Sequence, residues 1–270
     1  CLDEEEECFS LRKKLLDKID WECNLHTLFR SSNLGLKIAV SSALDWFFLE
    51  NECGIILEYD CLPDISFFKY CEVLLNMYKN DTRIFSISGN NIVDNHDLVP
   101  ESASYFFSSF TPVWGWATWR RSWACWNGFL ANYHEFNTHK VLNNRLGNSP
   151  AAIRFWKRNF DDIYYGRNTT TWAFCFNYYQ LINSSLCIVP KKNLVRNIGF
   201  GPQATHAVSD KHPLSDLKTY SVRALIHPNI ISANQKYDIS FSCLAGYIPP
   251  ILKVKIFLGR IKLILKLLYY

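Results

Sequence analysis

The sequence predicts an α/β fold in which helices flank a mostly parallel central sheet. Two observations carry this prediction. Strands predicted at 55–57 and 83–87 are separated by a helical segment at 66–78, which is the order of a βαβ unit. The first strand, Ile55-Ile56-Leu57, is a continuous aliphatic run, which is typical of strands covered on both faces.

The remaining elements follow from the periodicity of apolar residues. Helical spacing predicts helices over 10–19 and 37–49, and alternation predicts a short strand over 21–29. Asn33-Leu34-Gly35 reads as a turn. In the second half we expect an aromatic segment over 105–126, a helical stretch over 150–164, a further segment over 172–181 and a strand over 186–189.

Composition limits the classes of function. The chain has 270 residues, a net charge of +4 and a pI near 8.5. This excess of positive charge is too small and too dispersed along the sequence to indicate nucleic-acid binding. Its 10 cysteines are scattered, with no CxxC pair and no Cys/His spacing of the zinc type. We therefore expect a reduced, cytoplasmic chain without a disulfide framework.

The two ends of the chain differ from its middle. The sequence opens on an acidic run instead of a signal peptide, and its only methionine is Met77, so we expect a main domain over 1–245 that lacks its first strand. The tail over 246–270 is apolar and basic. Its residues 249–270 predict an amphipathic helix that contacts a membrane surface on the inner face of the cell membrane; the alternative is a helix packed on the domain.

Two acids, Glu58 and Asp60, follow the first aliphatic strand and flank Tyr59. Ligands of open α/β sheets bind beyond the carboxyl ends of the strands, and alternation places both carboxylates on one side. Carboxylate oxygens suit Mg²⁺ or Mn²⁺, which take their remaining ligands from water and phosphate. The alternative is a strand that exits into solvent through polar residues.

Three further segments supply candidate ligand contacts. Gly89-Asn90-Asn91 follows the second strand and offers amides to sugar hydroxyls. Trp114-Gly115-Trp116 presents aromatic faces that suit a sugar ring, although an aromatic core cluster gives the same pattern. Gly199 and Gly201 form a loop able to present backbone amides to phosphate, and His206 behind it is a candidate for metal, phosphate or a structural turn.

In several segments, in the same order, the chain resembles a family of bacterial glycosyltransferases of the GT-A fold. These enzymes are relatives of the eukaryotic N-acetylglucosaminyltransferases that initiate complex N-glycan branches. The matching segments are "TLFRSSNLG" at 27–35, "GIILEYDCLP" at 54–63, "RIFSISGNN" at 83–91, "YFFSSFTPVWGWATWRRSW" at 105–123 and "NLVRNIGFGPQATH" at 193–206.

The resemblance implies a GT-A-like nucleotide-diphospho-sugar transferase fold over 1–245. It implies an inverting, metal-dependent transfer of a sugar from a nucleotide-diphosphate sugar to a glycan or lipid-linked acceptor. Asp60 would hold the Mn²⁺ or Mg²⁺ ion and Glu58 would orient the nucleotide. Tyr59 stands where the family has its middle acid, and Trp172 joins the expected acceptor and sugar contacts.

The position of the catalytic base is the main departure from the family. Related enzymes keep an acid beside a Trp-containing helix, whereas this sequence reads Trp172-Ala173 there. The nearest acids are Asp161 and Asp162, and we expect Asp162 to be the base, with Asp161 second. Two alternatives stay open: a non-catalytic member of the fold that binds a nucleotide sugar or glycan, and a metal-dependent phosphohydrolase.

Overall fold

The computed structural model describes residues 2–93, 98, 102–136, 138–200 and 214–246, and divides the chain into two units, Cys1–Asn33 and Leu34–Tyr270. This division falls inside the domain that the sequence predicts over 1–245. Gly201, His206 and the tail over 249–270 lie outside the described residues, so the structure does not address the roles expected of them.

The smaller unit contains α1 (Leu2–Leu16) and an irregular segment that follows it. The predicted helix over 10–19 therefore forms, but it begins earlier and ends sooner. The predicted strand over 21–29 is wrong, because a strand needs a neighbour for its backbone hydrogen bonds and the described part of this unit contains no other strand. The Arg12 guanidinium instead lies 5.0 Å from the centre of the Phe29 ring.

The larger unit is built around a five-stranded sheet. Among the described pairings, that of β3 with β6 is parallel, whereas β1 with β5, β5 with β3, and β6 with β4 are antiparallel. Across the sheet the order is β1 (Cys53–Ile56), β5 (Trp116–Trp119), β3 (Ile84–Ser88), β6 (Leu186–Pro190) and β4 (Tyr105–Ser108).

The prediction of a mostly parallel sheet is therefore wrong: the sheet is mixed. Both reversed strands, β4 and β5, come from the aromatic segment over 105–126, and a fully buried strand has the same apolar pattern whichever way it runs. β1, β3 and β6 still run in one direction. Their carboxyl ends, after Ile56, Ser88 and Pro190, meet at one edge of the sheet, which we call the carboxyl edge.

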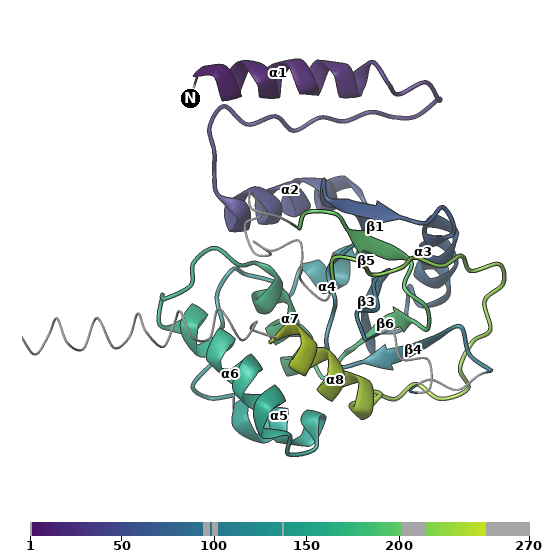
Figure 1. Ribbon diagram of the computed structural model, residues 1–270. Helices are drawn as coiled ribbons and strands as arrows, with labels where there is room; N and C mark the ends of the chain where they lie inside the picture. Colours follow the sequence, from purple (N-terminus) through teal and green to yellow (C-terminus); the bar gives the residue numbers. More distant parts are fainter. Residues whose placement is uncertain (1, 94–97, 99–101, 137, 201–213, 247–270) are drawn as a thin grey trace, which may run out of the picture. The chain divides into compact units, whose positions relative to one another are not determined.

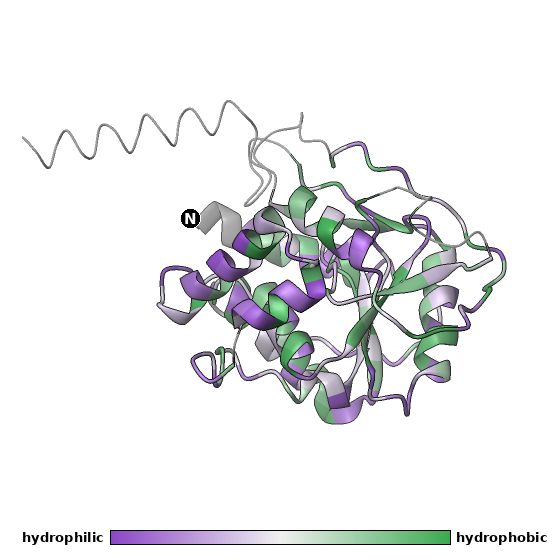
Figure 2. Cartoon of the chain, turned by 90° about the horizontal axis from the view of Figure 1, so that it is seen from below, coloured by the Kyte–Doolittle hydropathy of each residue, from purple (hydrophilic) through white to green (hydrophobic). Residues whose placement is uncertain are grey.

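Helices cover both faces of the sheet, as the sequence predicts (Figure 1). α3 (Ser66–Met77) packs on one face against Ile84 and Ile87, whereas Phe85 between them points into the opposite cluster. That second cluster holds side chains of α6 (Pro150–Tyr164), α7 (Ala173–Ile182) and α8 (Gln235–Ala245). In Figure 2 the helices carry both hydrophilic and hydrophobic colour, as expected of amphipathic helices packed on a sheet.

Most predicted elements form close to their predicted bounds. The helices expected over 37–49, 66–78 and 150–164 are α2 (Leu36–Glu50), α3 and α6, and the segment over 172–181 is α7. The strand expected over 186–189 is β6. The sequence pattern did not predict α4 (Arg120–Trp123), α5 (Thr138–Leu146), α8, or the short strands β2 (Cys61–Pro63) and β7 (Val195–Asn197) as elements of their own.

Short backbone contacts tie the loops at the carboxyl edge together. β2 and β7 form a two-stranded antiparallel ribbon, extended by the amide of Ile198, which donates to the carbonyl of Asp60 at 2.8 Å. The amide of Gly89 donates to the carbonyl of Gly115 at 2.7 Å, and the amide of Leu194 donates to the carbonyl of Gly89 at 2.8 Å. The loops after β1, β3 and β6 are thereby fixed relative to one another.

α8 is anchored to the sheet by a buried carboxylate. Asp238 accepts hydrogen bonds from the Ser108 hydroxyl at 2.6 Å and from the Ser109 amide at 3.0 Å. One turn later, the Ser242 hydroxyl accepts from the Trp156 indole at 2.8 Å, which joins α8 to α6. None of the helices in the described ranges combines the length and apolar character that crossing a membrane requires.

Candidate functional site

The two acids lie at the carboxyl edge, directly after β1. Residues 58–61 form a turn, closed by the amide of Cys61, which donates to the carbonyl of Glu58 at 3.0 Å. Glu58 and Asp60 are half-buried, whereas Tyr59 between them is 95% exposed. The two carboxylates therefore face the protein, and the tyrosine ring is left in solvent.

The environment of Glu58 disfavours its charged form. Burial, together with the negative charge of Asp60, raises the pKa of the Glu58 carboxyl, and a hydrogen bond from the Trp172 side chain opposes the shift. Indole is only a donor, so the Trp172 side chain acts on this carboxylate through its N–H. Two half-buried carboxylates that repel each other form a site that a bound cation would stabilise.

Gly199 packs directly on Asp60. A Cβ atom at Gly199 would overlap the Asp60 carboxylate, so a larger residue here would displace that side chain. The amide of Gly199 donates to the Asn197 side chain at 2.7 Å, which leaves it committed within the protein. In this structure Gly199 packs against Asp60 and its amide bonds to Asn197, whereas the sequence suggested a phosphate-binding amide there.

The tryptophans divide between core and surface roles. Trp116 is fully buried and stacks on Trp172, with ring centres 5.4 Å apart, so both belong to the core beneath the acids. Trp114 is partly buried and meets Phe200 edge to face at 5.8 Å. Gly115 between them has φ +66° and lies against Val195, a conformation and a contact that both favour glycine.

The polar residues after β3 also divide. The amide group of Asn91 donates to the carbonyls of Pro190 and Lys191, each at 3.0 Å, so its role is structural. A Cβ atom at Gly89 would overlap Phe67, so this position serves packing. Asn90 differs: it is 2% exposed, and its Nδ2 has no hydrogen-bond partner within the described residues.

Asn90 lines a cavity of about 330 Å³, which we call the apolar cavity. Two pairs of consecutive residues join it to the acids. Trp172 contacts Glu58 while Ala173 lines the cavity, and Gly199 contacts Asp60 while Phe200 lines it. The remaining lining comes from Ile92, Thr111, Pro112, Val113, Trp114, Phe155, Trp156, Phe174, Asn177, Leu214, Phe241, Leu244 and Ala245.

The two candidate bases lie elsewhere on α6. Asp161 accepts hydrogen bonds from the Tyr133 hydroxyl at 2.7 Å and from Lys157 at 2.6 Å. Asp162 accepts from Arg167 at 2.7 Å. Neither carboxylate lines the apolar cavity.

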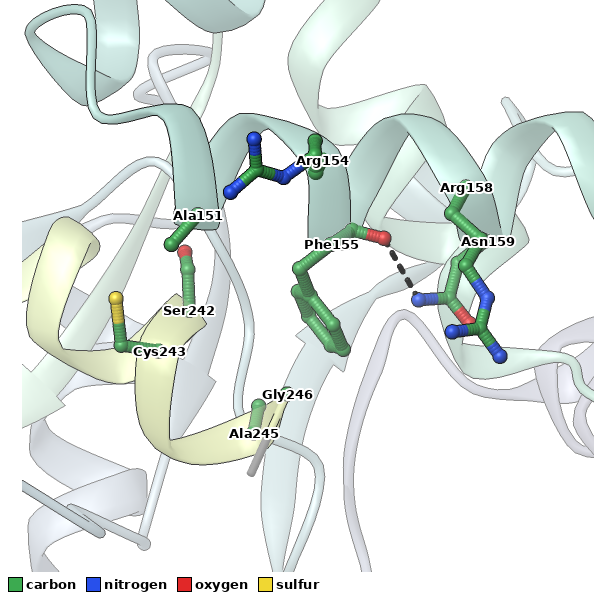
Figure 3. Close-up of a pocket in the computed structure, with 9 residues that line it drawn as sticks. All are labelled: Ala151, Arg154, Phe155, Arg158, Asn159, Ser242, Cys243, Ala245 and Gly246. Carbon is green, nitrogen blue, oxygen red and sulfur yellow. Dashed lines mark hydrogen bonds between the residues drawn. The ribbon is translucent and has the colours of Figure 1, made fainter. Parts of the chain in front are cut away.

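A second hollow lies on the other side of Phe155, between α6 and α8 (Figure 3). This arginine groove has a volume of about 530 Å³ and shares Phe155 and Ala245 with the apolar cavity. Figure 3 shows Arg154 and Arg158 on successive turns of α6, with Phe155 between them. Their spacing of four residues is visible in the sequence, but the facing helix α8 was not predicted, and so neither was the groove.

The acids suit a metal shared with a substrate better than a metal held by protein alone. Among the described residues there is no group of three or more His, Cys, Asp or Glu side chains that could enclose an ion. Mg²⁺ and Mn²⁺ sites that serve phosphate chemistry need one or two carboxylates, with water and phosphate completing the shell. Asp60 and Glu58 fit that requirement.

Comparison with known proteins adds no assignment: the sequence matches no protein-family model, and no curated protein matches it. A functional assignment therefore depends on the acids, the apolar cavity and the fold that joins them.

Proposed function

We propose that the chain is an inverting, metal-dependent glycosyltransferase of the GT-A fold, which transfers a sugar from a nucleotide-diphosphate sugar to a glycan or lipid-linked glycan. One observation carries the proposal. Glu58 and Asp60 sit at the carboxyl edge of an α/β sheet, and each lies beside a residue whose next neighbour in the chain lines a cavity that can hold a second substrate.

Each residue then has a defined task. Asp60, packed against Gly199, would bind the Mn²⁺ or Mg²⁺ ion, and Glu58, beside Trp172, would orient the donor. When bound, the ion neutralises the negative charge that develops on the departing nucleoside diphosphate. The exposed ring of Tyr59 is free to stack on the nucleotide base.

One observation favours the second candidate, a member of the fold that binds the donor without transferring its sugar. Within the described residues no carboxylate lines the apolar cavity, and Ala173 occupies the position where the related enzymes carry their acid. A phosphohydrolase is a weaker candidate, since it would require more acids or histidines around the metal than the described residues bring together.

Binding of uridine, guanosine and cytidine diphosphates, measured by calorimetry with and without Mn²⁺, tests the proposal. At least one should bind more tightly with the ion, and Asp60→Asn should remove the Mn²⁺-dependent part while keeping the fold, because it removes charge but little volume. Asp20→Asn, at an exposed acid in the smaller unit, is the matched control. Equal Mn²⁺-dependent binding by Asp60→Asn and its parent would refute the metal assignment.

A further inference from the structure

We propose that the acceptor carries an apolar group directly beside its reacting hydroxyl, and that this group occupies the apolar cavity. The inference rests on the proposed function, and it specifies the acceptor as a glycoside with an aliphatic or aryl aglycone rather than a free saccharide. It follows from the lining of the cavity, from the buried and unpaired amide nitrogen of Asn90 in that lining, and from the segments that join the cavity to the acids.

The lining offers few partners to a saccharide. The polar atoms of Asn177 are already committed: its oxygen accepts from the Thr111 amide at 2.7 Å, and its Nδ2 donates to the carbonyl of Ala173 at 3.0 Å. The Thr111 hydroxyl is bonded to Gln180. A sugar placed here would lose water from several hydroxyls with little compensation, whereas an apolar group gains from leaving water.

Asn90 supplies the exception. Its Nδ2 is a buried donor without a partner in the described part of the chain, and the residue lines the cavity. A buried donor left unpaired costs free energy that a ligand carrying one suitable acceptor recovers. The glycosidic oxygen, or a carbonyl next to the apolar group, meets this requirement.

The position of the cavity orients the acceptor. Ala173 and Phe200 line it, while the preceding residues, Trp172 and Gly199, contact the two acids. We therefore place the polar end of the ligand on the side of the cavity formed by Ala173 and Phe200, toward the donor. The volume of about 330 Å³ limits the apolar group to a short chain or a ring system.

Calorimetry with methyl, butyl, hexyl and octyl β-D-glucosides, below micelle formation, tests the inference; glucose is the head group alone. Affinity should rise about fourfold per methylene until the cavity is full. Ala173→Phe should flatten this increase by filling the cavity. The matched control is Ala151→Phe, an equivalent change in the first turn of α6 within the arginine groove.

Asn90→Ala separates the hydrogen bond from the apolar contact. It should weaken every glucoside by about fivefold without changing the increase per methylene. Its melting temperature should match that of the parent, because the Nδ2 has no partner to lose within the described residues. Ala245→Trp, at an exposed position on the cavity rim, is the second filling variant if Ala173→Phe does not fold.

The inference is overturned if glucose binds as tightly as octyl glucoside, if affinity rises without limit as the chain lengthens, or if both filling variants bind as the parent does. Nucleoside diphosphate binding with Mn²⁺ is measured on the same samples. If no nucleoside diphosphate binds but the chain-length effect is present, the transferase proposal is refuted and the apolar cavity remains a site for an apolar group. Loss of the chain-length effect alone would refute only the acceptor class.

Discussion

Asp238 should make the protein more stable as the pH falls from neutral toward 4.5. Burial raises the pKa of this carboxyl from 3.8 to about 6, although the hydrogen bonds from Ser108 and Ser109 oppose the shift. The folded state therefore binds the proton more tightly than the unfolded state does. Between these two pKa values the folded state holds more protons, so stability declines as the pH rises through that window.

The size of the effect follows from the two pKa values. The span from 3.8 to about 6 corresponds to about 3 kcal/mol in the free energy of unfolding. About 2 kcal/mol of this falls between pH 7.5 and pH 4.5. At pH 7.5 the carboxyl of the folded protein is almost fully ionised, and pH 4.5 is still above the pKa of the carboxyl in the unfolded chain.

The assay compares urea unfolding of the parent and of Asp238→Asn at pH 7.5 and pH 4.5. Other groups titrate in both proteins, so the quantity of interest is the difference in unfolding free energy between them. That difference should shift by about 2 kcal/mol in favour of the parent at the lower pH. A difference that stays constant, or shifts toward the variant, would refute the assignment of a raised pKa to Asp238.

Three further perturbations test the site and its support. Gly199→Ala should weaken Mn²⁺-dependent nucleotide binding by about tenfold with little change in melting temperature, because its Cβ would displace the Asp60 carboxylate; calorimetry and a thermal melt check this together. Trp156→Ala should lower the free energy of unfolding by about 3–5 kcal/mol, measured by urea titration, because it removes a 2% exposed indole and its bond to Ser242. Asp162→Asn should lower sugar transfer by about a hundredfold, and the product of the parent should have the inverted anomer; unchanged transfer by the variant would refute Asp162 as the base.

The sequence predicts the local elements well because their signals are local. The helices α2, α3 and α6 each carry an apolar face at helical spacing, and that face packs as expected. The sheet direction was not predictable in the same way. β4 and β5 are fully buried, so every position is apolar or small, and no pattern records which way the chain runs.

The site shows the same division between local and distant information. The spacing of Glu58 and Asp60 predicts two acids after a strand, and the structure places them there. The spacing of the acids does not predict that Trp172, more than a hundred residues later, lies beside Glu58, or that Gly199 packs on Asp60. Contacts of this kind depend on how distant segments meet, and one sequence carries no direct record of them.

The place of β1 in the sheet has a consequence for local opening. Among the described strands, β1 pairs with β5 alone, so those of its amide hydrogens that bond to β5 reach solvent when one four-residue ladder separates, an event far smaller than global unfolding. Trp116 of β5 pairs with Ile56 and stacks on Trp172, which in turn holds Glu58. A ligand fixed between the acids would therefore hold this ladder closed from its far end and slow deuterium uptake at the amides of 53–56 that bond to β5, although these amides touch no ligand.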